Sequence, residues 1–368
     1  MGHATDVLVI GSGPAGLAVA VAVRRKGLRV TVAESSNPPV DKACGEGLLP
    51  GTLAALRELG INILAGDGQT FRRLRFIDDT ISAQAHFLGE GGLGVRRTVL
   101  HRKMVERAEG SGVELLWNSP VTGLSRDGAI VGGRLIQAKW IVGADGIHSR
   151  VRRWSGLDTT VHREIRFAQR RHYRVKRSTD CVEVYWGGMT QAYVTPLANE
   201  ETCVVLISRD SLIHFDERLK EFPELADRLM NAELISRPRG AVTATCRLDR
   251  VYRGNTALTG DASGSVDAIT GEGLGLSFRQ AMALADALET DELEKYQLAH
   301  RRLARRPQVM ARLLLLLDRS TSLRRHVLRG FARDPALFAR MLKAHVRETS
   351  SVFLAATSAR LGWRLITA

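Results

Sequence analysis

Short apolar runs alternate with a helical stretch at the start of the chain. Residues 6–10 (DVLVI) are apolar, a glycine-rich turn follows, and residues 15–25 have the spacing of a helix. A second apolar run covers residues 28–33 and ends at Glu34. A strand, a helix and a strand within about 30 residues form the unit that builds a parallel sheet. The pattern therefore predicts an α/β domain.

The middle of the chain changes to the alternation that is typical of strands. Residues 73–87 indicate a hairpin that turns at Asp78 and Asp79, and four further runs indicate successive antiparallel strands. These runs cover residues 165–175, 181–186, 191–196 and 203–209. Arginines alternate with apolar residues in the first run, and we expect the arginines on a solvent-exposed face. They are Arg166, Arg170 and Arg174, with Ile165, Phe167, Tyr173 and Val175 on the other face. Residues 212–231 predict one amphipathic helix.

The α/β pattern returns later, so the first domain is predicted to be discontinuous. Residues 256–260 indicate a strand, and residues 273–288 indicate a helix after a second glycine-rich loop. Beyond residue 300 the chain looks helical, with Pro307 in a first turn and Asp334 as the cap before Pro335. The predicted domains are residues 1–72, 95–160 and 247–300 for nucleotide binding, 73–94 and 161–246 for the sheet, and 301–368 for the helices.

Composition indicates a soluble globular protein, since 44% of the residues are hydrophobic and 25% are charged. We find neither a transmembrane run nor a signal peptide, and we expect a cytoplasmic protein. The four cysteines have no CxxC spacing, so we expect no metal site. The net charge of +14 suggests an anionic partner, and residues 301–347 carry 13 Lys or Arg against two Asp. We expect a cationic outer face on packed helices there, with peripheral contact to an anionic membrane as the alternative. Nothing resembles a nucleic-acid module, and no nucleic acid is expected.

The first glycine-rich loop has the spacing G-x-G-x-x-G. Gly11 allows the tight turn, Gly13 lets the backbone approach a pyrophosphate, and Gly16 lets the helix pack close to the strand. The loop follows a strand and precedes a helix, and Glu34 ends the second strand, where it can accept hydrogen bonds from ribose hydroxyls. This loop predicts a dinucleotide.

A second glycine-rich element occurs more than 240 residues later, in residues 258–264 and 270–274. Asp261 is expected at a strand end, where it can bind the ribityl chain or the pyrophosphate. The turn at residues 271–274 opens a helix whose amides can stabilise negative charge on a flavin ring. Two such loops favour FAD over a nicotinamide dinucleotide.

These motifs, together with residues 142–152 (VGADGIHSRVR), resemble a known superfamily over roughly residues 5–300. It contains the p-hydroxybenzoate hydroxylase-type monooxygenases and the geranylgeranyl reductases, and all are FAD-dependent. The resemblance implies an α/β fold: a Rossmann-like FAD-binding domain with an inserted antiparallel β-sheet substrate domain and a helical C-terminus. It also implies NADPH or NADH as a transient electron donor.

Two segments favour the geranylgeranyl reductase branch. Residues 42–48 (KACGEGL) resemble the cysteine-glycine segment of geranylgeranyl and menaquinone reductases, and residues 267–273 (DAITGEG) resemble theirs and depart from the hydroxylases' His-x-x-Pro-Pro. Related epoxidases share the Thr-Gly-x-Gly turn. The favoured hypothesis is reduction of a carbon–carbon double bond in a lipophilic prenyl or polyketide-like substrate. The alternatives are a monooxygenase of an aromatic or lipophilic molecule, and a non-catalytic redox flavoprotein that binds membrane or nucleic acid.

The resemblance and the motifs together nominate the site residues. Cys44 or Tyr193 would return a proton, although Cys44 equally suits a small buried group in a tight loop. Arg97 has a surface ion pair as its alternative, and Asp145 a turn with Gly146. The predicted cofactor residues are Gly11, Gly13, Pro14, Ala15, Gly16, Glu34, Ser35, Cys44, Gly45, Arg97, Val121, Asp145, Gly146, Gly260, Asp261, Gly271, Glu272, Gly273 and Leu274. The predicted substrate pocket contains Tyr185, Trp186, Tyr193 and Pro196, with the core of the sheet as the alternative for each.

Overall fold

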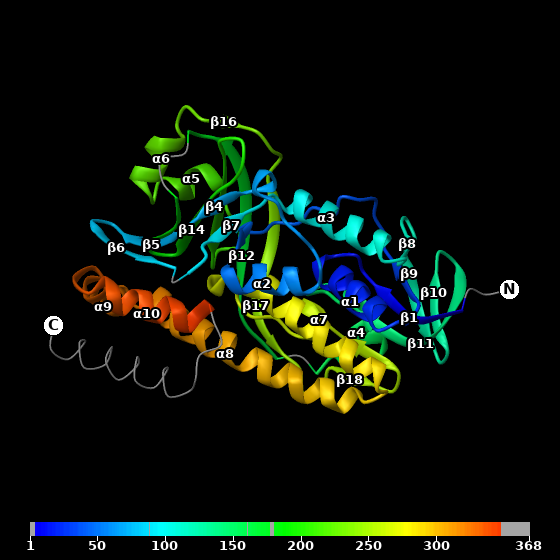
Figure 1. Ribbon diagram of the computed structural model, residues 1–368. Coiled ribbons are helices and arrows are strands. Elements are labelled where there is room, and N and C mark those ends of the chain that lie inside the picture. Colours follow the sequence, from blue (N-terminus) through cyan, green and yellow to red (C-terminus); the bar gives the residue numbers. More distant parts are fainter. Residues whose placement is uncertain (1–3, 88, 160, 177–179, 347–368) are drawn as a thin grey trace.

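The computed structural model describes residues 4–87, 89–159, 161–176 and 180–346, and it has the mixed α/β architecture that the sequence predicts (Figure 1). The first sheet is built around parallel strands in the order β19-β11-β1-β2-β8. Their bounds are β1 (Ala4–Ile10), β2 (Val30–Ala33), β8 (Glu114–Leu116), β11 (Arg134–Gly143) and β19 (Thr256–Leu258). Antiparallel strands extend it: β9 (Val121–Ser125), β10 (Gly128–Val131) and β18 (Tyr252–Arg253).

The first sheet forms because its central strands are apolar on both faces. Val7, Leu8 and Val9 of β1 are completely buried, as expected of a parallel strand that helices cover on both sides. The helices of this domain are α1 (Pro14–Arg25), α3 (Arg97–Gly110), α4 (Arg150–Trp154) and α7 (Gly273–Glu289). Since α1 and α7 lie side by side, the parts of the chain that carry the two glycine-rich loops meet (Figure 1).

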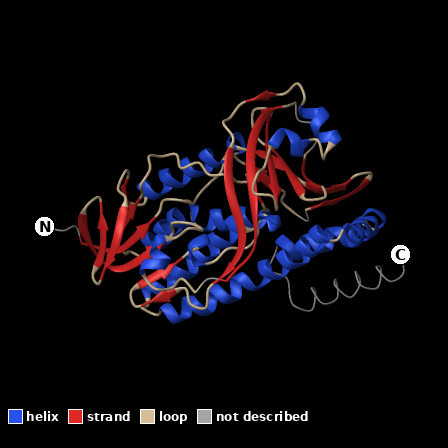
Figure 2. Cartoon of the chain, turned by 180° about the vertical axis from the view of Figure 1, so that it is seen from behind, coloured by secondary structure: helices blue, strands red, loops and turns tan. Residues whose placement is uncertain are grey.

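The second sheet has the order β16-β12-β15-β14-β13-β5-β6, and β17 pairs with β12. Its neighbours are antiparallel, apart from the parallel pair β13 and β5. The bounds are β5 (Arg73–Asp78), β6 (Ile81–His86), β12 (Val161–Arg174), β13 (Cys181–Trp186), β14 (Thr190–Pro196), β15 (Glu201–Ser208), β16 (Glu233–Leu234) and β17 (Arg239–Arg247). Seen from behind, this sheet stands beside the helices that cover the first (Figure 2).

A third, small sheet is formed by segments that lie, along the chain, between strands of the first large sheet and strands of the second. Its strands are β3 (Gly47–Leu48), β7 (Gly92–Gly94) and β4 (Gln69–Phe71), in that order. The helix α2 (Pro50–Glu58) follows β3 and packs on β7 and α7. Three short 3-10 turns are also described: η1 (Ala65–Asp67) beside β4, η2 (Gly260–Ser263) beside α7 and η3 (Ala268–Thr270) beside α8 (Leu293–Arg319).

Up to residue 346, where the described part of the chain ends, three helices follow the first domain: α8 (Leu293–Arg319), α9 (Thr321–Arg333) and α10 (Pro335–Val346). The last two pack against β6 of the second sheet (Figure 1). Asp334 is confirmed as the residue before α10, where its carboxylate accepts a hydrogen bond from the Leu337 amide at 3.1 Å. The placement of Pro307 in a first turn is wrong, because Pro307 lies inside the 27-residue α8. Packing of the buried residues around it outweighs the helix penalty of about 3 kcal/mol.

The single helix predicted at residues 212–231 is also wrong. Two short helices occupy this stretch, α5 (Phe215–Leu219) and α6 (Pro223–Leu229). Proline has no amide hydrogen and disfavours helical geometry in the residue before it, so Pro223 ends the first helix and begins the second.

The solvated arginine face predicted for β12 is wrong for Arg166 and Arg170, whereas Arg174 is exposed as predicted. Arg166 and Arg170 are each 2% exposed, whereas Ile165 is 50% exposed. The arginines face two loops of the first domain that carry carboxylates, and each guanidinium is paired there. Tyr173, on the other face, packs in the core beside α5. Alternation along a strand distinguishes its two faces, but it does not show which of them is covered.

Candidate functional site

The first glycine-rich loop is packed so tightly that only glycine fits at two of its positions. A Cβ at Gly16 would lie 1.9 Å from the carbonyl oxygen of Gly11, and one at Gly11, where φ is +103°, would lie 2.7 Å from that of Ala144. At Gly13, by contrast, no atom of the described residues lies within 4 Å of the Cβ position. Helix α1 begins at Pro14, directly behind this open space.

Glu34 lies at the end of β2 beside this loop. One carboxylate oxygen accepts hydrogen bonds from the Ser12 amide at 2.9 Å and the Ser12 hydroxyl at 3.0 Å. The other accepts from the Ser36 amide at 3.0 Å and the Ser35 hydroxyl at 3.2 Å. Partial burial raises the pKa of Glu34, but these hydrogen bonds lower it by more, so the pKa falls below its ordinary value. Glu34 is therefore an ionised acceptor at the strand end.

His101, which the sequence reasoning missed, supports the same loop from α3. It is fully buried, and its Nε2 lies 3.1 Å from the Ser12 carbonyl oxygen. Burial lowers the pKa of His101, so the ring is neutral near pH 7. The polar and apolar residues of α3 do not separate into two faces, so the sequence did not indicate that His101 would be buried against the loop.

The second glycine-rich loop meets the first directly. Gly260 has a φ of +58°, and a Cβ there would lie 2.6 Å from the Cβ of Ala15. Its amide donates to Gln280 of α7 at 3.2 Å. Asp261 follows; its side chain is exposed, yet enough protein surrounds it that desolvation raises its pKa, against the opposing effect of Lys42 and Arg97.

The turn before α7 has the geometry expected from its glycines. Gly271 is left-handed with a φ of +65°, and no described atom lies within 4 Å of the Cβ position of Gly273, where α7 begins. Leu274 is half-buried. Glu272 points elsewhere: its carboxylate lies 3.7 Å from His345 of α10 and 3.9 Å from Arg306 of α8. The structure thus places Glu272 toward the C-terminal helices.

The loop at residues 41–47, the Cys44 loop, contains a buried glutamate. Cys44 is half-buried, and its Sγ accepts a hydrogen bond from the Glu46 amide at 3.4 Å. The Cβ position of Gly45 has no described atom within 4 Å. Glu46 is 3% exposed with a left-handed φ of +57°, and one oxygen accepts from the Arg97 amide at 2.9 Å. Arg97 lies at the start of α3 and is itself buried.

Strand β12 supplies the other partners of this loop. Arg170 donates to Glu46 at 3.2 Å and to both oxygens of Asp41 at 2.9 Å. His172 Nε2 lies 2.7 Å from the second Glu46 oxygen. Burial raises the pKa of Asp41, but Arg170 lowers it more, so it falls below its ordinary value. Sequence reasoning missed Glu46, Arg170 and His172 as site neighbours.

Glu46, His172 and Cys203 hold three potential metal-ligand atoms within 4.8 Å of one another. The contacts favour a hydrogen-bond network instead. Both Glu46 oxygens already accept hydrogen bonds, and the Arg170 guanidinium beside them would repel a cation. Burial raises the pKa of Cys203 well above its ordinary value, which disfavours the thiolate that a metal needs.

Arg166 connects β12 to the segment before the Gly271 turn. It makes a bidentate ion pair with Asp267, which is completely buried, and donates to Gln191 at 2.9 Å. Gln191 in turn accepts from the Tyr193 hydroxyl at 3.2 Å. Burial raises the pKa of Tyr193, so the phenol holds its proton tightly.

The predicted pocket residues are divided between the faces of the second sheet. Trp186 and Tyr193 lie on the face that packs with Ile269 and the C-terminal helices. Tyr185 lies on the opposite face, where its ring centroid is 5.9 Å from that of Phe222. Neighbouring residues of a strand point to opposite faces, so Tyr185 cannot share a pocket with Trp186. Pro196 ends β14, with its carbonyl close against Gly94 of β7.

The three remaining predicted cofactor residues have structural partners. The Asp145 carboxylate accepts from the amides of Arg150 at 2.7 Å and Val151 at 3.2 Å, at the start of α4. Gly146 has a φ of +83°, and the ammonium nitrogen of Lys42 lies 3.6 Å from its Cβ position. Val121 is buried in the core of the first domain.

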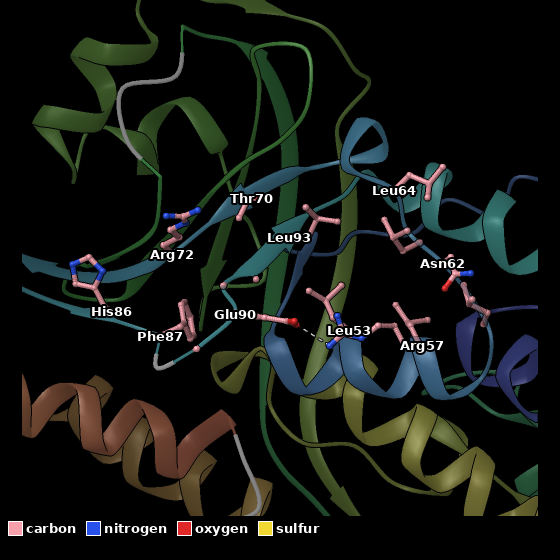
Figure 3. A pocket seen from close by; sticks show the side chains of 16 residues that line it. Leu53, Arg57, Asn62, Leu64, Thr70, Arg72, His86, Phe87, Glu90 and Leu93 are labelled. Carbon is pink, nitrogen blue, oxygen red and sulfur yellow. Dashed lines mark hydrogen bonds and ion pairs between the residues drawn. The ribbon is translucent and has the colours of Figure 1, made fainter.

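A separate open pocket of about 820 Å³ lies between α2 and the small sheet (Figure 3). Leu53 of α2 and Leu93 of β7 form part of its apolar wall. Arg57 and Glu90 pair across it at 2.9 Å, and His86 lies toward its far end (Figure 3). None of the predicted cofactor or substrate residues lines this pocket.

The geometry suits an extended dinucleotide such as FAD. Open Cβ positions at Gly13, Gly45 and Gly273 belong to three different loops, and a ligand could approach the backbone closely at each of them. Gly13 lies at the N-terminus of α1, and Gly273 lies at the N-terminus of α7. Helix N-termini favour negative charge. Glu34 provides an acceptor for hydroxyls at one end.

Comparison with known proteins agrees with this geometry. The model of a family described as "FAD binding domain" matches residues 4–293. A digeranylgeranylglycerophospholipid reductase of Methanococcoides burtonii is 27% identical over 79% of this chain and 78% of its own. A menaquinone reductase of Mycobacterium tuberculosis is 26% identical over 85% of this chain and 84% of its own. A solved flavoprotein/dehydrogenase from Cytophaga hutchinsonii has a TM-score of 0.81 at 23% identity, covering 93% of this chain and 92% of its own.

Proposed function

Because this chain belongs to the FAD-binding domain family and is an FAD-dependent oxidoreductase, we propose that it reduces a carbon–carbon double bond of a lipophilic substrate with electrons from NADH or NADPH. The substrate class is a prenyl or polyketide-like lipid. FAD, when bound, would pass the hydride from the nicotinamide to the double bond. The residues that would hold FAD are those around Gly13, Glu34, Asp261 and Gly273.

The position of the Cys44 loop carries the proposal. The loop lies between the first domain and β12, with Cys44 half-buried and Lys42 near both Gly146 and Asp261. A thiol there can give a proton to a carbon atom as hydride arrives at its neighbour. Tyr193 is the weaker candidate, because burial raises the pKa of its phenol.

One apolar face of the second sheet is covered by the C-terminal helices. Trp186, Phe76 and Ile269 are buried in one cluster, and Tyr193 packs against it. Two relatives act, by their names, on a prenylated lipid and a quinone, which supports a lipophilic substrate.

Product analysis tests the reaction. The purified holoprotein is incubated with NADH or NADPH and candidate prenyl lipids, under nitrogen and in air. The masses of the products are then measured by mass spectrometry. We expect a gain of two hydrogen atoms in both atmospheres. A product that gains an oxygen atom, and only in air, would establish the alternative function, a monooxygenase.

A substitution at Cys44 tests whether this residue donates the proton. Cys44→Ala should leave the reduction of FAD by NAD(P)H unchanged and slow product formation at least tenfold. Cys181→Ala, a buried cysteine in β13, is the matched control and should keep the wild-type rate. Equal rates in wild type and Cys44→Ala would remove Cys44 from the chemistry.

We also propose that α8 contacts an anionic membrane surface. Val309, Leu313 and Leu316 are 46 to 50% exposed, and Arg305, Arg312 and Arg319 are exposed around them. Apolar side chains flanked by arginines complement an interface of acyl chains and anionic headgroups. Among the described residues, no helix is both long and apolar enough to cross a bilayer. Vesicles with 30% anionic lipid should bind the wild type more tightly than Leu313→Asp, and equal binding would contradict this.

A further inference from the structure

The C-terminal helices contact the turn that leads into α7. The Nε2 of His345 in α10 lies 2.7 Å from the Thr270 carbonyl oxygen, and Arg306 of α8 donates to the His345 carbonyl. We propose that His345 and Arg306 are positioning residues, which hold the turn at residues 270–273 and thereby determine how strongly the protein stabilises reduced FAD. The inference rests on the proposed function in one respect, namely that FAD lies against Gly273.

The second sheet anchors the segment before this turn. Arg166 of β12 pairs with Asp267, and the Thr243 hydroxyl of β17 accepts a hydrogen bond from the Ala268 amide at 2.8 Å. Both contacts precede Gly271, which is the left-handed residue of the turn. Because glycine loses more conformational freedom on ordering than any other residue, the turn that follows depends on further contacts.

Two side chains of the C-terminal helices supply these contacts. A carbonyl oxygen only accepts hydrogen bonds, so His345 Nε2 carries the hydrogen in its contact with Thr270, whatever the state of Nδ1. Glu272 is 7% exposed, and its carboxylate lies 3.9 Å from Arg306 and 3.7 Å from His345. These separations exceed a hydrogen bond, so Glu272 and Arg306 attract each other as opposite charges. Since Thr270 and Glu272 flank Gly271, the helices hold both neighbours of the flexible residue.

The helices that carry His345 to the turn are themselves fixed to the second sheet. Arg324 of α9 donates to Asp78 of β5 at 2.6 Å, and both side chains are buried. The rings of Phe331 in α9 and Phe338 in α10 stack with their centroids 4.6 Å apart, which joins the two helices. His345 therefore reaches the turn from a packed position in the last turn of α10.

The turn lies at the N-terminus of α7, where backbone amides stabilise negative charge. Glu272 immediately precedes this helix, and Gly273 is its first residue. Reduction of FAD adds negative charge to the flavin ring, and the helix effect falls off within one turn, so its strength depends on where these amides point. A displaced turn should therefore weaken the binding of reduced FAD more than that of oxidised FAD.

The test compares two substitutions of His345. Leucine cannot donate to the Thr270 carbonyl, whereas the side-chain amide of glutamine can. We expect His345→Leu to bind reduced FAD at least tenfold more weakly relative to oxidised FAD, which lowers the two-electron midpoint potential by about 30 mV or more. His345→Gln should restore the ratio to within twofold of the wild type. The potential is measured by spectroscopic titration of the FAD-loaded protein against a reference dye, and no substrate is needed.

Two further variants separate the contact with the turn from a general loosening of the helices. Arg306→Met should lower the potential as well, because Glu272 loses its cation and the His345 carbonyl loses its donor. Arg325→Gln is the matched control, since it removes the ion pair between Arg325 of α9 and Asp78, 3.5 Å apart. Its potential should match the wild type. The melting temperature of each variant without FAD measures how far the helices have loosened.

The outcomes separate this inference from the proposed function. A wild-type potential in His345→Leu, or a full shift in His345→Gln, would overturn the positioning role. An equal shift in Arg325→Gln would also overturn it, because the effect would then come from loosened helices. If His345→Leu does not fold, Arg306→Met decides by the same comparison with the control. If the wild type takes up FAD but leaves every double bond intact, the proposed function fails, and the potentials still decide whether His345 positions the turn.

Discussion

The first glycine-rich loop and the Cys44 loop border the same candidate site but are held in place by different forces. Backbone packing holds the first: Gly11 and Gly16 admit no side chain. Buried charge holds the second, through Glu46 and Arg170. A loop built from backbone contacts carries its signature in its own residues. A loop held by ion pairs has partners far along the chain, so its own sequence does not reveal its conformation.

The largest effect should come from the glycine that packs most tightly. Gly16→Ala places a Cβ 1.9 Å from a backbone oxygen, so α1 must move, and the free energy of unfolding should fall by about 4 kcal/mol or more. FAD should be lost as well. Gly13→Ala is the matched control, because its Cβ enters open space: FAD binding should weaken while the melting temperature without flavin stays unchanged. Equal destabilisation by both variants would refute the packing argument.

The next effect should come from the charge that holds the second loop. Arg170→Met leaves the buried Glu46 without its cation and leaves the half-buried Asp41 with Arg239 alone, and this should cost about 3 to 5 kcal/mol in urea unfolding. Arg174→Met, exposed on the same strand, should change stability by less than about 0.5 kcal/mol. A loss below 1 kcal/mol for Arg170→Met would mean that water or rearrangement satisfies the two carboxylates.

The second glycine-rich loop should respond to acid through His300. Its Nε2 lies 2.9 Å from the Ser263 hydroxyl, and burial lowers the pKa of His300 to about 4. The unfolded chain therefore binds this proton first, and stability falls as the pH drops from about 6.5 toward 4. At pH 5 the histidine should cost about 2 kcal/mol relative to pH 8. His300→Gln should remove this part of the acid sensitivity; a slope identical to wild type would contradict the shifted pKa.

The smallest effect concerns the face of β12 that the sequence pattern assigned to the interior. Ile165 is 50% exposed, so Ile165→Thr should change the free energy of unfolding by less than about 0.5 kcal/mol. The stability of Ile165→Thr is measured by thermal unfolding and compared with that of Phe167→Thr, since Phe167 is half-buried on the same face. A loss of more than 2 kcal/mol for Ile165→Thr would support the expectation from the sequence that Ile165 faces the interior.

Sequence patterns predicted the parts of this fold that depend on local rules. The strand, glycine turn and helix around Gly13 follow from steric limits on the backbone, and the hairpin at Asp78 follows from alternation and a turn. Glu34 was found because its position relative to the loop is fixed by the same unit.

The rest depended on partners that no local pattern contains. Arg166 looked like a surface residue because Asp267, its partner, lies about 100 residues away. Tyr185 and Trp186 looked like one aromatic patch, but adjacent residues of a strand face opposite sides. Glu46 lies in the KACGEGL segment, but that pattern assigns it no role, because only the fold brings His172 to it.

The pairing of β19 with β11 also determines when this protein can first capture a flavin during its synthesis. Thr256 to Leu258 must emerge from the ribosome before the edge of β11 is covered, and Gly260 must follow before the loop at Ala15 gains its neighbour. Until then a nascent chain carries an apolar parallel sheet with an open edge, which invites association with other chains. Chaperone dependence should therefore end, and flavin uptake begin, only after Gly273, about three quarters of the way along the chain, has emerged from the ribosome.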